Sequence, residues 1–75
     1  MIHIGKQIKE KLKESGKTVV WFSNALSCSR TNVYKLFGKA SISTEDLYRI
    51  SCILHYNFFE DLAAETDDAI ENLKD

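Results

Sequence analysis

Hydrophobic residues along the chain recur with the period of helices. Ile4, Ile8 and Leu12 lie four residues apart among lysines, which places them on one face of a helix. The chain has no proline and only three glycines, so the residues that usually mark strands and tight hairpins are scarce. We therefore expect an all-α fold, with a first helix that ends at Ser15 and Gly16 because glycine favours a helix stop.

Four further helices are predicted by residues that favour helix N-termini. Side-chain oxygens of Ser, Thr and Asn accept hydrogen bonds from the free N–H groups of a first helical turn. One of these starts reads Ser-Thr-Glu-Asp, a capping box directly before an apolar stripe. The predicted caps and helices are Thr18 with residues 19–26, Ser29 with residues 30–37 (ended by Gly38), Ser43 with a helix from residue 44, and Asn57 with a short last helix.

A chain of 75 residues is long enough for one domain with one modest core. We expect the packed domain to span residues 1–64, and residues 65–75 to form an acidic tail, either a frayed helix or disordered. No stretch approaches the about 20 apolar residues of a membrane span, and residues 1–17 do not resemble a secretory signal, so a cytoplasmic protein is expected. The expected core consists of Ile8, Leu12, Phe22, Leu26, Val33, Leu36, Leu47, Ile50, Leu54 and Leu62.

Charge is divided unevenly along the chain, although the net charge is only −1. Residues 1–41 contain eight Lys and Arg against two acidic residues, a net charge of +6, and residues 42–75 contain two against nine, a net charge of −7. A strongly basic half indicates contact with a polyanion. Ordinary solvent-exposed helix faces would give the same pattern, so charge alone does not separate the two interpretations.

The third predicted helix carries side chains that suit double-stranded DNA. With Val33 and Leu36 facing inward, the other positions face solvent. Arg can bond guanine, Asn can bond adenine, and Thr can contact the thymine methyl group, whereas Tyr and Lys can reach a phosphate. A solvated helix face of the same composition is the alternative. The candidate side chains are Arg30, Thr31, Asn32, Tyr34 and Lys35.

The stretch from residue 18 to 38, TVVWFSNALSCSRTNVYKLFG, resembles the helix-turn-helix of Xre/Cro-type (phage-repressor-like) regulators. The stretch from residue 43 to 62, STEDLYRISCILHYNFFEDL, is similar to the fourth and fifth helices of that family. The resemblance covers about residues 4–63. It implies a compact five-helix DNA-binding domain, with the helix-turn-helix formed by helices 2 and 3, and a role in transcription regulation. The base contacts that it implies are those of Arg30, Thr31, Asn32 and Lys35.

Three positions depart from the family pattern. At the tight contact between the two helices, Ser23 stands where the family usually has Ala, and serine is nearly isosteric with it. Ser27 stands in the turn where the family usually has Gly, so the turn has to tolerate a residue with a side chain. Val19 stands where many members have a Gln that touches a phosphate, and valine cannot make that bond. We therefore expect the contacts to the DNA backbone to come from Lys17, Thr18, Ser29, Tyr34 and Lys39.

Other function classes are less well supported by the sequence. A protein-interaction module or antitoxin-like accessory protein would use the acidic half together with Phe58 and Phe59. A homodimer is compatible with DNA binding, because two copies match two half-sites. For an enzyme, the one imaginable nucleophile–base pair is Cys28 with His55, and so small a bundle leaves little room for a substrate pocket.

The remaining reactive side chains predict no cofactor. Cys28 and Cys52 fit neither a disulfide framework nor a Cys-x-x-Cys motif, and we interpret both as buried thiols. His3 and His55 lack neighbours at metal-ligand spacing, so no metal site is expected. We interpret Trp21 as a core aromatic residue, with a position at the rim of the DNA-binding surface as the alternative.

Overall fold

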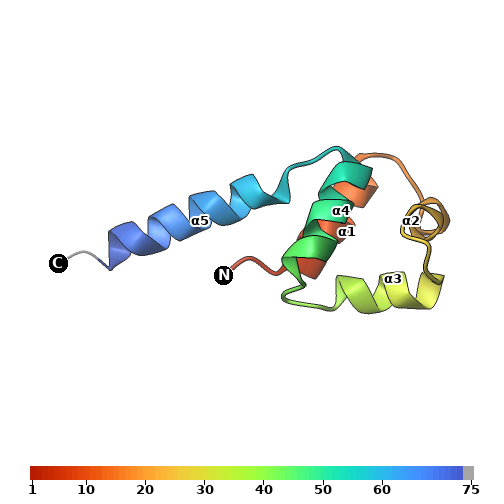
Figure 1. The fold of residues 1–75 in the computed structure, drawn as a ribbon, viewed down its shortest axis with the longest axis horizontal. Coiled ribbons are helices and arrows are strands. Elements are labelled where there is room, and N and C mark those ends of the chain that lie inside the picture. Colours follow the sequence, from red (N-terminus) through yellow and green to blue (C-terminus); the bar gives the residue numbers. More distant parts are fainter. Residues whose placement is uncertain (74–75) are drawn as a thin grey trace.

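The computed structural model describes residues 1–73, and within that range it contains five α-helices and no strand (Figure 1). Residues 74–75 of the expected acidic tail lie outside the described residues. The expectation of an all-α fold with five helices is confirmed. The helices are α1 (Ile4–Glu14), α2 (Val19–Ala25), α3 (Arg30–Phe37), α4 (Thr44–Leu54) and α5 (Phe58–Asn72).

The predicted helix starts are confirmed by hydrogen bonds. Each predicted cap accepts a bond from a backbone N–H of its own first turn, which satisfies one of the free donors there. These bonds run from Trp21 to Thr18 (3.0 Å), from Asn32 to Ser29 (3.1 Å), from Asp46 to Ser43 (3.1 Å) and from Phe59 to Asn57 (3.0 Å).

The core lies where α1, α2, α3 and α4 meet the start of α5. Most of the expected core residues are buried there, but Leu26, Leu36, Leu54 and Leu62 are only partly buried and pack against its edge. Their prediction as core residues was wrong because periodicity shows which side of a helix faces the core but not how deeply each residue is buried. A domain this small also leaves a large fraction of its surface exposed. The fully packed residues are Ile4, Ile8, Leu12, Phe22, Val33, Leu47, Ile50 and Phe58, of which Ile4 and Phe58 were not expected.

Helix α5 is longer than the short last helix that was expected. It has 15 residues, so it continues as helix through residues 65–72, the segment expected as a tail. Its start is anchored by Phe58, which is 0% exposed, and its C-terminal half protrudes from the α1–α4 bundle (Figure 1). The molecule is therefore elongated, at 48 × 20 × 20 Å.

Polar contacts attach the first turns of α5 to α1. The carboxylate of Asp61 accepts hydrogen bonds from the Gln7 amide and from the Tyr56 hydroxyl, the latter at 2.5 Å. The bond to Asp61 raises the pKa of Tyr56 above its ordinary value. The Lys11 ammonium lies 4.3 Å from the centre of the Tyr56 ring. These contacts fix the direction in which α5 leaves the bundle.

A second attachment joins α5 to the N-terminal residues. The Glu65 carboxylate accepts the Ile2 backbone N–H at 2.9 and 3.1 Å and lies 3.3 Å from the amine of Met1. The Ile2 hydrogen bond, which favours the charged carboxylate, holds the pKa of Glu65 below its ordinary value. Residues 1–2 thereby support the middle of α5.

Candidate functional site

Helices α2 and α3 are joined by a tight turn that changes the direction of the chain. In Figure 1, α2 is seen nearly end-on while α3 lies across the picture, so the two helices cross steeply. The Cys28 N–H bonds the Ser23 carbonyl at 2.9 Å, and Ser27 has a φ of +56°. Ser27 thus adopts the left-handed conformation that favours glycine, which is the backbone that the turn requires. Ser23, 4% exposed, is small enough for the close approach of the two helices.

The inner face of α3 is fixed to the core by a single buried side chain. Val33 is 0% exposed, and Leu36 and Phe37 pack beside it, partly buried. Ser29 caps the helix start. Packing against the core therefore sets the position of α3, and the local cap sets its beginning.

Every base-contacting residue predicted from the sequence is exposed on α3, with Thr31 and Lys35 at the centre of its outer face. Tyr34 is 61% exposed, with its ring edge-on to Phe37 at 6.1 Å. The helix contains no acidic residue, so nothing on it repels phosphate. Arg30 and Asn32 flank this face, since they lie on either side of Thr31 on the helical wheel. The exposed set is Arg30, Thr31, Asn32, Tyr34 and Lys35.

The residues expected to contact a DNA backbone are also exposed. Apart from Tyr34 within α3, they lie just before α2, just before α3 and just after α3. The Thr18 and Ser29 hydroxyl oxygens accept the capping bonds, which leaves each hydroxyl hydrogen able to donate to a phosphate. Lys17 and Lys39 are exposed on the loops before α2 and after α3. Val19, at the position of the usual Gln, packs partly buried against the core instead.

The sequence analysis did not identify Gly5, which lies in the first turn of α1 and contacts the backbone at the end of α3. The N–H groups of Ile4 and Gly5 donate to the carbonyls of Ala40 (3.0 Å) and Lys39 (2.8 Å), so the free donors of α1 are satisfied by the chain just after α3. A Cβ on Gly5 would lie 2.5 Å from the Leu36 carbonyl oxygen and 2.7 Å from that of Lys39. Only glycine permits this contact, and no local pattern indicated it.

Arg49 on α4 was also missed. Its guanidinium reaches the Leu26 carbonyl at 3.4 Å, and it lines a surface groove between α3 and α4 together with Asn32, Lys39 and Asp46. The groove therefore holds two cations and one acid at the edge of the α3 face. The sequence signal was available, because Arg49 is one of only two cations in the acidic half.

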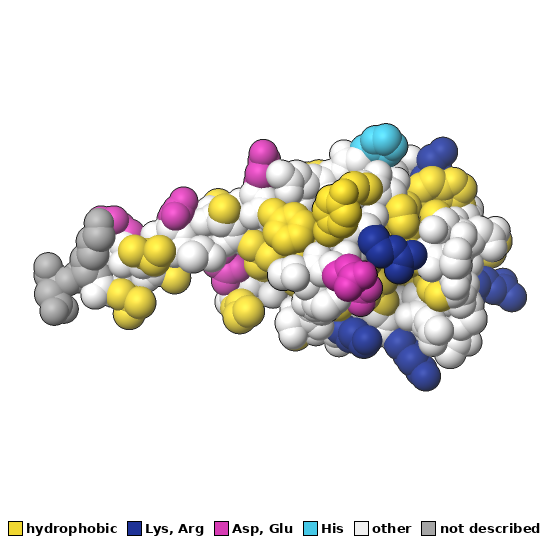
Figure 2. Space-filling view, in the orientation of Figure 1, with side chains coloured by type: hydrophobic (Ala, Val, Ile, Leu, Met, Phe, Trp, Pro, Cys, Tyr) yellow, Lys and Arg dark blue, Asp and Glu magenta, His cyan; other side chains and the backbone are white. Residues whose placement is uncertain are grey.

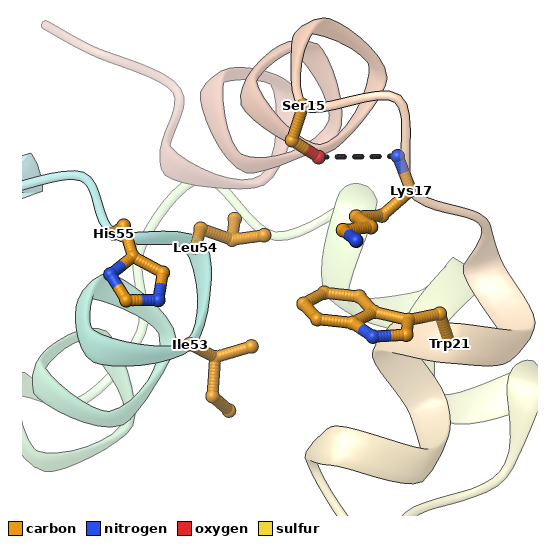
Figure 3. A pocket seen from close by; sticks show the side chains of 6 residues that line it. All are labelled: Ser15, Lys17, Trp21, Ile53, Leu54 and His55. Carbon is orange, nitrogen blue, oxygen red and sulfur yellow. Dashed lines mark hydrogen bonds between the residues drawn. The ribbon is translucent and has the colours of Figure 1, made fainter.

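Trp21 borders a pocket of about 330 Å³ between α2 and the end of α4 (Figure 3). Its indole is 37% exposed and lies below the Lys17 ammonium, 5.4 Å from ring centre to nitrogen. The interpretation of Trp21 as a core residue was therefore wrong. Its indole faces Ile53 and Leu54 across the pocket (Figure 3).

The expectation that both cysteines are buried was wrong. Cys28 is half-buried and Cys52 is exposed. Cys28 lines the groove between α3 and α4, whereas His55 lines the pocket beside Trp21, so the imagined nucleophile–base pair faces two different pockets.

Surface charge separates along the molecule. On the face shown in Figure 2, Lys and Arg side chains lie over the α1–α4 bundle, and most Asp and Glu side chains lie along α5. Among residues 1–73, no three His, Cys, Asp or Glu side chains are grouped to hold a metal ion. No helix in the described part is long and apolar enough to cross a membrane.

Comparison with known proteins gives no relative. No family model, curated protein or solved structure matches this chain.

Proposed function

We propose that this protein binds double-stranded DNA sequence-specifically by placing α3 in the major groove, and that it acts as a transcription regulator without a cofactor. The observation that carries the proposal is the exposed face of α3, which has five polar side chains and no acid. Its opposite face is fixed by Val33, which is 0% exposed. A major groove about 12 Å wide admits one such helix.

The proposed roles follow from the chemistry of each side chain. Arg30 and Asn32 read purine edges through paired hydrogen bonds, and Thr31 contacts a thymine methyl group. Lys35 reaches a base or the adjacent phosphate, and Tyr34 donates its hydroxyl to the backbone. Phosphates on either side are held by Lys17, Thr18, Ser29 and Lys39, all exposed around α3.

The proposal is tested by titrating labelled duplex DNA with the protein and following fluorescence anisotropy at low and moderate salt. We expect binding that weakens strongly as salt rises, because Lys and Arg release counterions from the phosphates. Absence of binding at low salt would refute the proposal.

A charge-matched pair of variants separates reading by α3 from general attraction. The double variant Arg30→Ala with Lys35→Ala is expected to weaken binding by about tenfold or more, since each good base contact is worth about 1–3 kcal/mol. The double variant Lys9→Ala with Lys13→Ala removes the same charge from the exposed side of α1, and we expect a much smaller effect. Equal losses in the two variants would contradict the role of α3.

A further inference from the structure

The pocket beside Trp21 combines apolar walls with one lysine. Its volume of about 330 Å³ lies in the range of sites that hold small molecules. Within residues 1–73, no Asp or Glu lines this pocket, whereas the groove between α3 and α4 contains Asp46. The lining residues are Ser15, Lys17, Trp21, Ile53, Leu54 and His55.

Two opposed walls give the pocket a shape that suits a flat ring. The indole of Trp21 forms one wall, and Ile53 and Leu54 form the other (Figure 3). Both aliphatic residues are partly buried and pack against the core, and the backbone N–H of Trp21 donates to the cap of α2. A ring between the walls would stack on the indole and remove apolar surface on both sides from water.

Lys17 places a positive charge at the edge of the same pocket. Its ammonium lies 5.4 Å from the centre of the indole ring (Figure 3), and its backbone N–H donates to the Ser15 hydroxyl oxygen at 3.3 Å. The ion pairs of the described part of the chain do not include Lys17. Attraction to an aromatic face is weak at an exposed site, so this charge is available to an anion.

We propose that this pocket binds a small aromatic carboxylate. The ring lies between Trp21 and the aliphatic wall, and the carboxylate pairs with the Lys17 ammonium. Charge complementarity selects this class of ligand. A cation would be repelled by Lys17, a neutral ring would leave that charge without a partner, and a short aliphatic acid would leave both walls hydrated.

A bound acid would also oppose DNA binding, and this consequence rests on the proposed function. Lys17 is one of the proposed phosphate contacts, so a carboxylate and a phosphate compete for the same ammonium. By linkage, DNA then weakens binding of the acid by the same factor. Binding of the acid in the absence of DNA does not depend on the proposed function.

Trp21 is the single tryptophan of the chain, so its fluorescence reports directly on the pocket. The probe is 3-phenylpropionate, which does not absorb where tryptophan is excited. A ligand of about 11 non-hydrogen atoms is expected to bind with a Kd on the order of 1 mM. At constant ionic strength, the acid should bind about three- to fivefold more tightly than neutral 3-phenylpropanamide, the gain of a partly exposed ion pair. Propionate, which has the charge without the ring, should leave the fluorescence unchanged.

Two exposed lysines give a matched pair of variants. Lys17→Gln and Lys13→Gln each remove one positive charge from a solvent-exposed position, and only Lys17 lines the pocket. The Lys17→Gln protein is expected to bind the acid and the amide equally, and the Lys13→Gln protein to keep the preference for the acid. No fluorescence change with about 10 mM 3-phenylpropionate would overturn the proposal. An equal response of the wild type to acid and amide, or an unchanged preference in Lys17→Gln, would overturn it as well.

The competition with DNA is measured separately by fluorescence anisotropy of a labelled duplex. At matched ionic strength, saturating 3-phenylpropionate should weaken DNA binding by the wild type and leave binding by Lys17→Gln unchanged. A wild type that binds both ligands without mutual interference would refute the competition. A protein that binds the acid but no DNA would refute the proposed function and leave the carboxylate site standing, so the two failures are distinguishable.

Discussion

The contact between Gly5 and the end of α3 predicts a large effect from a very small substitution. Gly5→Ala adds one methyl group, which would lie 2.5 Å from the Leu36 carbonyl oxygen and 2.7 Å from that of Lys39. Both oxygens belong to the backbone, so no side-chain rotation relieves the clash. The start of α1 has to move away from the chain that follows α3.

The cost follows from the contacts that this movement breaks. The Ile4 and Gly5 N–H bonds to Ala40 and Lys39 are each worth about 0.5–1.5 kcal/mol, and inserting a methyl group into a packed site typically costs about 1–3 kcal/mol. The better helix propensity of alanine offsets at most about 1 kcal/mol of this loss. We expect a net loss of about 2 kcal/mol.

Thermal unfolding followed by circular dichroism measures this loss. For a domain of this size about 2 kcal/mol corresponds to a fall in Tm of about 10 °C. Gly38→Ala is the control, because Gly38 has a φ of −84° and its nearest contact to an added Cβ is 3.5 Å away; its stability should stay within about 1 kcal/mol of the wild type. A Gly5→Ala protein as stable as the wild type would refute the reasoning, as would an equal loss in Gly38→Ala.

Three further predictions concern single side chains. Ser27→Gly should raise stability by about 0.5 kcal/mol in urea unfolding, since glycine avoids the about 1–2 kcal/mol penalty of the +56° φ but loses more backbone entropy on folding; a destabilised variant would contradict the described turn. Ser29→Ala should cost about 1 kcal/mol through the lost cap of α3, and an unchanged Tm would contradict it. The pKa of Glu65 is lower in the folded protein than its usual 4.5, so its contribution is full above pH 4.5 and disappears as the pH falls through the lower folded value. The stability difference between wild type and Glu65→Gln should shrink over that range, and a difference independent of pH would refute the contact.

Local signals in the sequence predicted the helices well. Thr18, Ser29, Ser43 and Asn57 cap the helices that were expected from them, because capping depends on atoms within three residues. The extent of α5 was less predictable. Its apolar stripe beyond residue 64 includes Thr66 and Ala69, which contribute little to a hydrophobic pattern.

Features that depend on distant parts of the chain were not predictable. The contact of Gly5 with Lys39 joins residues 34 positions apart, and nothing around Gly5 in the sequence indicates it. The partial exposure of Leu54 and Trp21 depends on how the second and fourth helices meet. The candidate site on α3 was more accessible to sequence reasoning, because its inner and outer faces follow from helical geometry once Val33 is buried.

The central claim, that α3 reads a DNA sequence, is tested most directly by selecting bound duplexes from a random pool. We predict enrichment of a short motif with the wild type, and relaxed preference at one position of that motif with Asn32→Ala, because loss of a base contact affects the base that it reads. A selected pool with the same composition as the starting pool, from protein that is folded and binds DNA at low salt, would contradict sequence-specific reading by α3.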